Sequence, residues 1–208
     1  MRNQYPLLLG LLALLLFSLL FAGIGGDFWL QLAGSVFLLA ALAVGVDRNG
    51  RKALCSPPPE GWGKSVLLGL ISAALLYGVF MVAGALARQI MGFASDQIDA
   101  VYTLKAGRST WLMATLIALI IGPGEEIFWR GYLQRKLHAR YGVAGSTIAI
   151  LAYEGAHMAS LNLMLIAAAL VCGIFWGILY ARFRSIWLNI ISHVAWDLAV
   201  FLLLPLTA

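Results

Sequence analysis

The sequence predicts an all-α protein, a polytopic bundle of about seven transmembrane helices. Of its 208 residues, 62% are hydrophobic and only 11% are charged, against about 25% charged residues in an ordinary soluble domain. The apolar residues form long runs such as 7–16, without the alternating polar positions that a transmembrane β-barrel needs. Because lipid offers the backbone no hydrogen-bond partner, the chain is expected to cross the membrane as helices.

The apolar runs predict where the spans lie, since about 20 residues cross about 30 Å of hydrocarbon. The first run follows Arg2 and precedes Ala22 and Gly23, which also fits a signal peptide. A second run begins almost at once at Phe28, as a membrane hairpin requires. No repeat or second domain is visible, so 1–208 is expected to be one integral membrane domain. The predicted spans are 6–24, 28–46, 65–86, 109–130, 143–161, 163–181 and 185–206.

Basic residues between the spans predict the orientation, because loops rich in Lys and Arg stay cytoplasmic. Three of the 14 Lys and Arg residues, Arg88, Lys105 and Arg108, fall on one side. The N-terminus is therefore expected in the cytoplasm and the C-terminus outside. The net charge of +5 is a topology signal, and no basic cluster with interleaved aromatic residues suggests nucleic acid. The eleven on the other side are Arg2, Arg48, Arg51, Lys52, Lys64, Arg130, Arg135, Lys136, Arg140, Arg182 and Arg184.

The two longest loops differ in character. The loop 47–64 contains three consecutive prolines and predicts a stiff turn or linker. Residues 87–108 carry apolar side chains at helical spacing, which predicts an interfacial helix. Cys55 and Cys172 form no CxxC motif and no disulfide framework, so both are read as packing residues.

Ionisable side chains inside apolar spans are costly and are candidates for function. Only 15 residues, about 22 Å of helix, separate the start of the fourth span from Glu125, so Glu125 and Glu126 are predicted to lie inside the membrane. If the chain turns near Tyr141-Gly142, Glu125 and His157 lie 16 residues from Tyr141 in opposite directions and reach one level. His193 lies about 14 Å beyond the next turn at 182–184. Three helices are thus predicted to meet at one polar site.

Helical angles assign partners to these groups. Glu126 and Arg130 are i,i+4 neighbours and are expected to pair, either as a structural pair or in the chemistry itself. Glu125 lies 140° from Arg130 and remains unpaired. His193 and Asp197 share a face, so Asp197 can orient the His193 ring.

Two further features surround the carboxylates. Gly122-Pro123-Gly124 is expected to interrupt the helix and leave free N–H groups beside Glu125. Glu154, three residues before His157, either orients that ring or faces an outer vestibule.

Three motifs in order resemble the CAAX protease and bacteriocin-processing family, also called Abi, over about residues 109–200. The resemblance implies a glutamate-dependent intramembrane endopeptidase, in which Glu125 and His157 activate the attacking water and Glu126 and Arg130 organise the site. It also implies that His193 and Asp197 hold the oxyanion. The motifs are Glu125-Glu126-x-x-x-Arg130-Gly131, Tyr153-x-x-x-His157 and His193-x-x-x-Asp197.

Two positions depart from the family pattern. Tyr153 stands where Phe is usual and adds a hydroxyl group. Asp197 is the acidic variant of the third motif, and an ionised carboxylate cannot donate to an oxyanion. Either Asp197 is protonated, or it only orients His193 while His193 donates, and we favour the second reading.

The sequence thus predicts hydrolysis of a peptide bond in a membrane-associated or membrane-anchored protein or peptide, with the lipid bilayer as its surroundings. There is no HExxH motif, so no metal or other cofactor is expected, although two His and nearby carboxylates could also bind zinc. The alternatives are a proton-coupled carrier, since intramembrane Glu, His and Asp also form proton relays, and a non-catalytic immunity protein. By resemblance, the small size indicates a prokaryotic plasma membrane.

Overall fold

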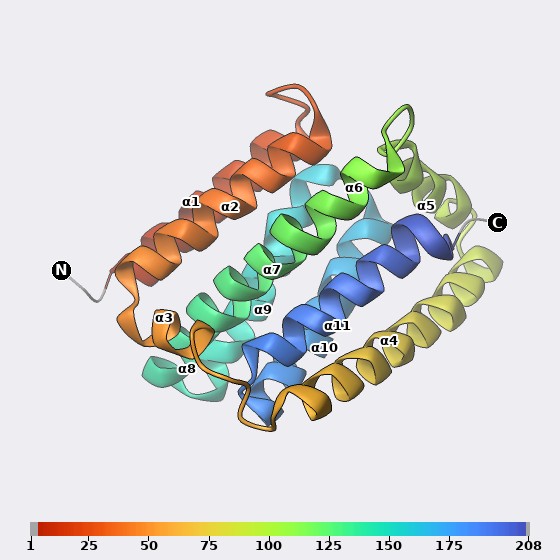
Figure 1. The fold of residues 1–208 in the computed structure, drawn as a ribbon. Coiled ribbons are helices and arrows are strands. Elements are labelled where there is room, and N and C mark those ends of the chain that lie inside the picture. Colours follow the sequence, from red (N-terminus) through yellow and green to blue (C-terminus); the bar gives the residue numbers. More distant parts are fainter. Residues whose placement is uncertain (1–3, 207–208) are drawn as a thin grey trace.

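The computed structural model describes residues 4–206, and all regular structure in that part of the chain is helical, as predicted. The long helices lie side by side, with α1 and α2 along one edge, α4 along the opposite edge, and α5 near the C-terminal end (Figure 1). The α-helices outside 104–142 are α1 (Tyr5–Phe21), α2 (Phe28–Val46), α3 (Arg48–Leu54), α4 (Trp62–Ile90), α5 (Ala94–Thr103), α9 (Val143–His157), α10 (Leu163–Phe183) and α11 (Ile186–Leu198). A 3-10 turn, Met158–Ser160, follows α9, and a π-turn, Ala199–Leu203, follows α11.

Five helical stretches of the described residues are long and apolar enough to cross a membrane. Beside them lie two shorter helices, α1 with 17 residues and α9 with 15. This arrangement agrees with about seven spans and with an integral membrane protein. The five stretches are Phe28–Val46, Trp62–Ile90, Thr110–Tyr141, Leu163–Phe183 and Ile186–Leu203.

The central helix runs without a break from Thr110 to Tyr141 and is longer than the predicted span 109–130. It ends at Gly142, whose φ of +59° and ψ of −138° suit only glycine, so the predicted hairpin turn is confirmed. A Cβ at Gly145 would lie 2.0 Å from the Leu137 carbonyl oxygen, so the two arms of the hairpin touch at the backbone. The helix consists of α6 (Thr110–Leu116), a π-turn (Ile117–Ile121), α7 (Gly122–Glu125), a second π segment (Glu126–Gln134) and α8 (Arg135–Tyr141).

The loop 47–64 is more ordered than the sequence predicts, because it contains α3. Asp47 begins this helix, its carboxylate accepting a hydrogen bond of 3.1 Å from the Gly50 N–H. The same carboxylate, 3% exposed, pairs with Arg135 and lies 2.8 Å from Lys136 on α8. The pattern of three prolines gave no sign of these long-range ion pairs. The helix expected within 87–108 is present as α5.

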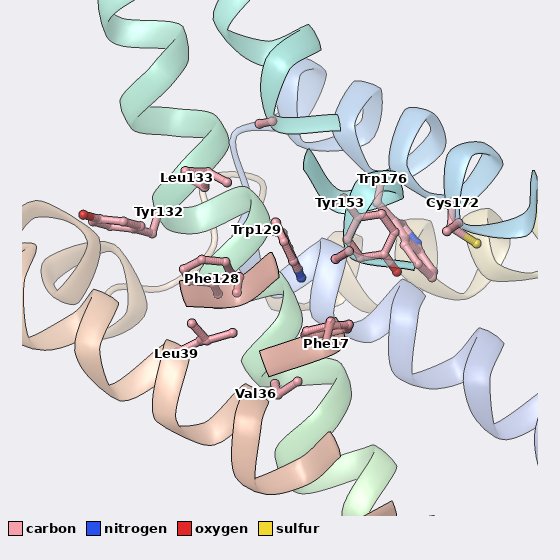
Figure 2. Packing of buried hydrophobic residues seen from close by; sticks show 14 of the residues in the cluster. Phe17, Val36, Leu39, Phe128, Trp129, Tyr132, Leu133, Tyr153, Cys172 and Trp176 are labelled. Carbon is pink, nitrogen blue, oxygen red and sulfur yellow. The ribbon is translucent and has the colours of Figure 1, made fainter. Parts of the chain in front are cut away.

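Aromatic side chains from three helices form the centre of the bundle (Figure 2). Phe17 of α1 meets Trp129 edge to face at 6.1 Å, and Trp129 meets Tyr153 of α9 at 5.3 Å. Such edge-to-face contacts between buried rings stabilise packing beyond the area they bury. The N-terminal helix is therefore joined to the helices that carry the predicted site.

Candidate active site

Two glycines let the central helix pass closely between its neighbours just before Glu125. A Cβ at Gly122 would lie 2.6 Å from Val194 on α11, and one at Gly124 would lie 2.5 Å from Val36 on α2. The expected interruption at Gly122-Pro123-Gly124 is wrong. Proline lacks an N–H, and the π-turn before it, closed by the Gly122 N–H to the Ile117 carbonyl, makes room for its ring. No free helix end therefore forms beside the carboxylates.

Glu126 is fully buried, and each of its carboxylate oxygens has a partner. Arg130 donates to Oε1 at 2.9 Å, so the predicted i,i+4 pair is confirmed. His193 Nδ1 lies 2.8 Å from the same oxygen, and Asn189 Nδ2 donates to Oε2 at 3.0 Å. This carboxylate is saturated, because it compensates two potential cations and accepts three hydrogen bonds.

Arg130 lies inside the bundle and not in a cytoplasmic loop, since it is only 2% exposed. Its guanidinium carbon stands 4.5 Å from the centroid of the Tyr153 ring and 5.4 Å from that of Trp176. Arg130 therefore does not count among the eleven basic residues that predict the cytoplasmic side. A second one, Arg2, lies outside the described residues.

The ring of His193 lies between two carboxylates, of which the sequence predicted only Asp197. Asp197 Oδ2 lies 3.4 Å from Nε2, and Glu126 Oε1 lies 2.8 Å from Nδ1. An ionised carboxylate only accepts, so Nδ1 must carry the proton shared with Glu126. Nε2 can then donate only when the ring is doubly protonated, and the two flanking carboxylates compensate that charge.

Trp176 and Asn189 complete this group, and neither is among the predicted site residues. Trp176 stacks on His193 with ring centroids 3.8 Å apart and planes at 18°. Its indole N–H donates to Ser192, which in turn accepts from Ser72 on α4. Asn189 donates to the Trp176 carbonyl at 2.9 Å. Asn189 lies one turn before His193 on the same face of α11, a position that helical spacing marks in the sequence. Nothing in the sequence marks Trp176 apart from other membrane tryptophans.

His157 stands at the end of α9 with one ring nitrogen engaged. Nδ1 lies 2.9 Å from the Tyr153 carbonyl oxygen, and since a carbonyl only accepts, Nδ1 carries the proton and Nε2 is the acceptor. Phe17 and Phe21 of α1 pack at 5.6 Å on this ring. Within residues 4–206 no hydrogen bond joins Glu154 to it, so the Tyr153 carbonyl takes the orienting role considered for Glu154.

A cavity of about 120 Å³ brings four of the predicted residues together: Glu125, His157, His193 and Asp197. Glu125 is 5% exposed, and its Oε2 has no hydrogen-bond partner in the described chain. It is thus unpaired, as the helical angles predict. The remaining wall is aromatic and aliphatic and comes mainly from the other helices. It consists of Phe17, Phe21, Phe28, Trp29, Leu32, Val101, Leu104, Ile121, Tyr153, Leu165, Ala168, Ala169, Cys172, Trp176, Trp196 and Phe201.

Arg130 and Glu126 lie behind this cavity rather than in its wall. They fix the positions of His193 and of the helix that carries Glu125. Among residues 4–206, no group of three His, Cys, Asp or Glu side chains is arranged to hold a metal ion.

Comparisons with known proteins give one match. No curated protein and no solved structure matches the chain. The sequence model of the Rce1-like family, described as type II CAAX prenyl endopeptidase, matches residues 107–199. This segment contains all six predicted site residues, from Glu125 to Asp197. The resemblance predicted from the three motifs is therefore confirmed over residues 107–199, where the chain matches the family of type II CAAX prenyl endopeptidases.

Proposed function

We propose that the protein is an intramembrane endopeptidase that hydrolyses a peptide bond with water activated by Glu125 and His157. One observation carries the proposal: buried Glu125 lines the same cavity as His157, and one of its carboxylate oxygens has no partner in the described residues. An unpaired carboxylate in a dry site is available to accept a proton from water.

The neighbouring Glu126 is unsuited to this task. Its two oxygens are occupied by Arg130, His193 and Asn189, so a water molecule would have to displace one of these donors. Glu126 acts instead as a positioning residue, since it sets the tautomer and orientation of His193.

The proposed reaction has two steps, attack of water on the substrate and cleavage of the C–N bond. Glu125, aided by the His157 Nε2 lone pair, takes a proton from water as the oxygen attacks the carbonyl carbon of the substrate. The C=O bond opens to an oxyanion, which accepts a hydrogen bond from His193 Nε2–H. The proton held on Glu125 passes to the amide nitrogen of the leaving segment, the C–N bond breaks, and a carboxylic acid and an amine result.

The surroundings of the cavity support a membrane-associated protein or peptide as the substrate. Five residues of its wall also line an apolar groove of about 300 Å³ between α4, α5, α10 and α11. An apolar passage of this kind suits a chain that lies in or against the bilayer. The shared residues are Val101, Leu165, Ala168, Trp196 and Phe201.

The mechanism needs no metal or other cofactor, and we propose that the enzyme works without one. We place it in a prokaryotic plasma membrane with its N-terminus in the cytoplasm, because ten of the basic residues in the predicted loops remain on one side once Arg130 is removed from the count.

The proposal is tested by profiling new N- and C-termini of membrane proteins in cells that carry the wild type, Glu125→Gln or Glu154→Gln. Glu154 is the matched control, since it receives the same carboxylate-to-amide change in a partly exposed position and is not in the cavity wall. We expect new termini with the wild type and Glu154→Gln and none with Glu125→Gln. A carrier or an immunity protein would yield no new termini with any of the three, and that result would overturn the proposal.

A further inference from the structure

A cleft separate from the candidate active site is lined by residues of α1 and the end of α2 on one side and of the central helix, α8 and α9 on the other. Figure 1 shows where these helices lie. The volume of the cleft is about 1060 Å³, much more than that of the candidate active site. It is lined by Gln4, Tyr5, Pro6, Leu7, Gly10, Leu11, Leu14, Val46, Asp47, Arg48, Asn49, Tyr132, Leu133, Lys136, Leu137, Arg140, Tyr141, Ile148 and Ala152.

The mouth of this cleft is cationic. Arg48, Lys136 and Arg140 line it together with one acidic residue, Asp47. Asp47 already pairs with Arg135 as well as with Lys136, so it does not neutralise the mouth. Arg48 is exposed and has no ion pair within residues 4–206. The mouth therefore carries an excess of positive charge at the predicted cytoplasmic end of the helices.

The deeper part of the cleft is apolar and follows α1. Leu7 and Leu11 are 66% and 54% exposed, and Leu14 continues the same stripe over about 10 Å of helix. At Gly155 the helix α9 comes close to Leu14, since a Cβ there would lie 3.7 Å from the leucine side chain. The cleft is thus an open groove with a basic mouth and an apolar wall along α1.

A polar side chain at the floor of the cleft lacks a partner. Tyr132 is 2% exposed, and no hydrogen bond reaches its hydroxyl from any described residue. The hydroxyl points away from the aromatic cluster around Phe128 (Figure 2). The hydroxyl oxygen is not among the enclosed polar atoms of the described residues, so it is accessible at the cleft and can form a hydrogen bond with a ligand atom.

We propose that this cleft binds an anionic phospholipid, with the phosphate between Arg48 and Lys136 and one acyl chain along α1. Basic residues at the cytoplasmic ends of membrane helices attract anionic headgroups, and the guanidinium and ammonium groups form charge-assisted hydrogen bonds with phosphate. The apolar wall of the cleft covers the acyl chain. A soluble anion without an acyl chain would leave this part of the cleft empty. This site is separate from the candidate active site and does not depend on the proposed function.

The test uses the purified full chain in phosphatidylcholine nanodiscs, to which phosphatidylglycerol is added. Bound phosphatidylglycerol is counted by native mass spectrometry after release from the disc. The double change Arg48→Gln with Lys136→Gln should weaken binding about tenfold or more. The matched control is Arg51→Gln with Lys52→Gln, which removes the same charge from exposed positions of α3 outside the cleft and should keep affinity within about twofold.

Two further arms test the apolar part. Ala152→Phe fills the cleft and should abolish retention, whereas Leu151→Phe, on the neighbouring exposed face of α9, should not. Glycerol phosphate without acyl chains should fail to compete. The proposal is overturned if both charge variants lose affinity equally, if glycerol phosphate competes, if phosphatidylcholine is retained as well as phosphatidylglycerol, or if Ala152→Phe still retains the lipid.

Discussion

Glu125 and Glu126 are adjacent in sequence, but only Glu126 has hydrogen-bond partners among the described residues. Glu126 accepts hydrogen bonds from Arg130, Asn189 and His193, whereas Glu125 faces the cavity without a hydrogen bond from the described chain. We therefore expect Glu125→Gln to abolish turnover while the protein stays folded, because the amide keeps the shape of the side chain but cannot take a proton.

Glu126→Gln should act mainly on stability. It leaves Arg130, 2% exposed, and His193 without their anionic partner, and breaking a buried ion pair costs about 3–5 kcal/mol. A second change, Arg130→Met, should recover part of that loss, because it removes the uncompensated charge. Thermal unfolding in detergent and turnover of the three variants measure both effects. A folded, inactive Glu126→Gln beside an active Glu125→Gln would reverse the roles.

Asp197 offers a separate prediction, because its carboxylate lies 3.4 Å from the His193 nitrogen that we assign to the oxyanion. An ionised carboxylate competes with the oxyanion for that N–H and cannot donate, whereas an amide can. In Asp197→Asn the protonated ring still has one anionic partner, Glu126, at 2.8 Å. We expect Asp197→Asn to retain kcat or raise it, and Asp197→Ala to lower it about tenfold or more. A loss in the Asn variant as large as in the Ala variant would show that the negative charge itself is needed.

The metal-free proposal predicts that activity survives chelation by a membrane-permeant agent. His157 Nδ1 and His193 Nδ1 are both engaged with oxygen acceptors, and no metal cluster is found within residues 4–206. Turnover before and after chelation is the measurement. Loss of activity that stoichiometric zinc restores would contradict the proposal and make both His residues candidate ligands.

Residue-level prediction from the sequence succeeded where partners lie on one helix. Glu126 and Arg130 are four positions apart, so helical geometry alone brings them together. The bond from Glu126 to His193 spans 67 positions and depends on how α11 packs, which no local pattern records. The sequence therefore predicts the contact of Asp197 with His193, which lies on the same helix, but not the contact of Glu126 with the other ring nitrogen.

At the scale of elements, Gly124 allows the central helix Thr110–Tyr141 to pack closely against α2. Gly124 lies so near Val36 that a methyl group would come within 2.5 Å of it. We expect Gly124→Ala to destabilise the protein by about 1–3 kcal/mol through overpacking and to displace Glu125, its neighbour.

A double-mutant cycle tests this close approach. Val36→Ala should relieve the overpacking and recover much of the stability and activity lost in Gly124→Ala. Gly34→Ala is the control on α2, because nothing lies within 4 Å of its added methyl group. Equal unfolding temperatures for Gly34→Ala and Gly124→Ala would show that the contact with Val36 is not limiting.

The sequence predicted most elements correctly but misread Pro123. Apolar runs predicted most of the long helices within a few residues, since membrane thickness and hydrophobicity are properties that each run carries by itself. The central helix is the exception, because it continues beyond the predicted end at 130 to Tyr141. Proline usually ends or kinks a helix, but here a π-turn between α6 and α7 absorbs it, with α2 and α11 packed on either side. The short helix α3 was missed because Asp47 is stabilised from α8, 88 positions away.

For the whole molecule, the orientation in the membrane can be tested by cysteine labelling from outside the cell. His138 lies on α8 at the predicted cytoplasmic end, and Asp96 is exposed on α5 at the opposite end. With a membrane-impermeant reagent, His138→Cys should react only after lysis, whereas Asp96→Cys should react in intact cells. The native Cys55 is exposed at the same end as α8 and serves as an internal control in the wild type. Labelling of position 138 in intact cells would refute the orientation.

The site can be completed only after α11 has been synthesised, because its residues lie on helices that follow one another in the chain. The Glu126–Arg130 pair forms within one helix, but Asn189, His193 and Asp197 all belong to α11, which is synthesised after the central helix and after α9 and α10. Until α11 docks, the nascent chain has a carboxylate beside an arginine and no donor for an oxyanion. Under the proposed mechanism, proteolytic competence is acquired only after α11 has inserted and packed, so we expect a chain in which α11 has not yet been inserted to leave its neighbours uncut.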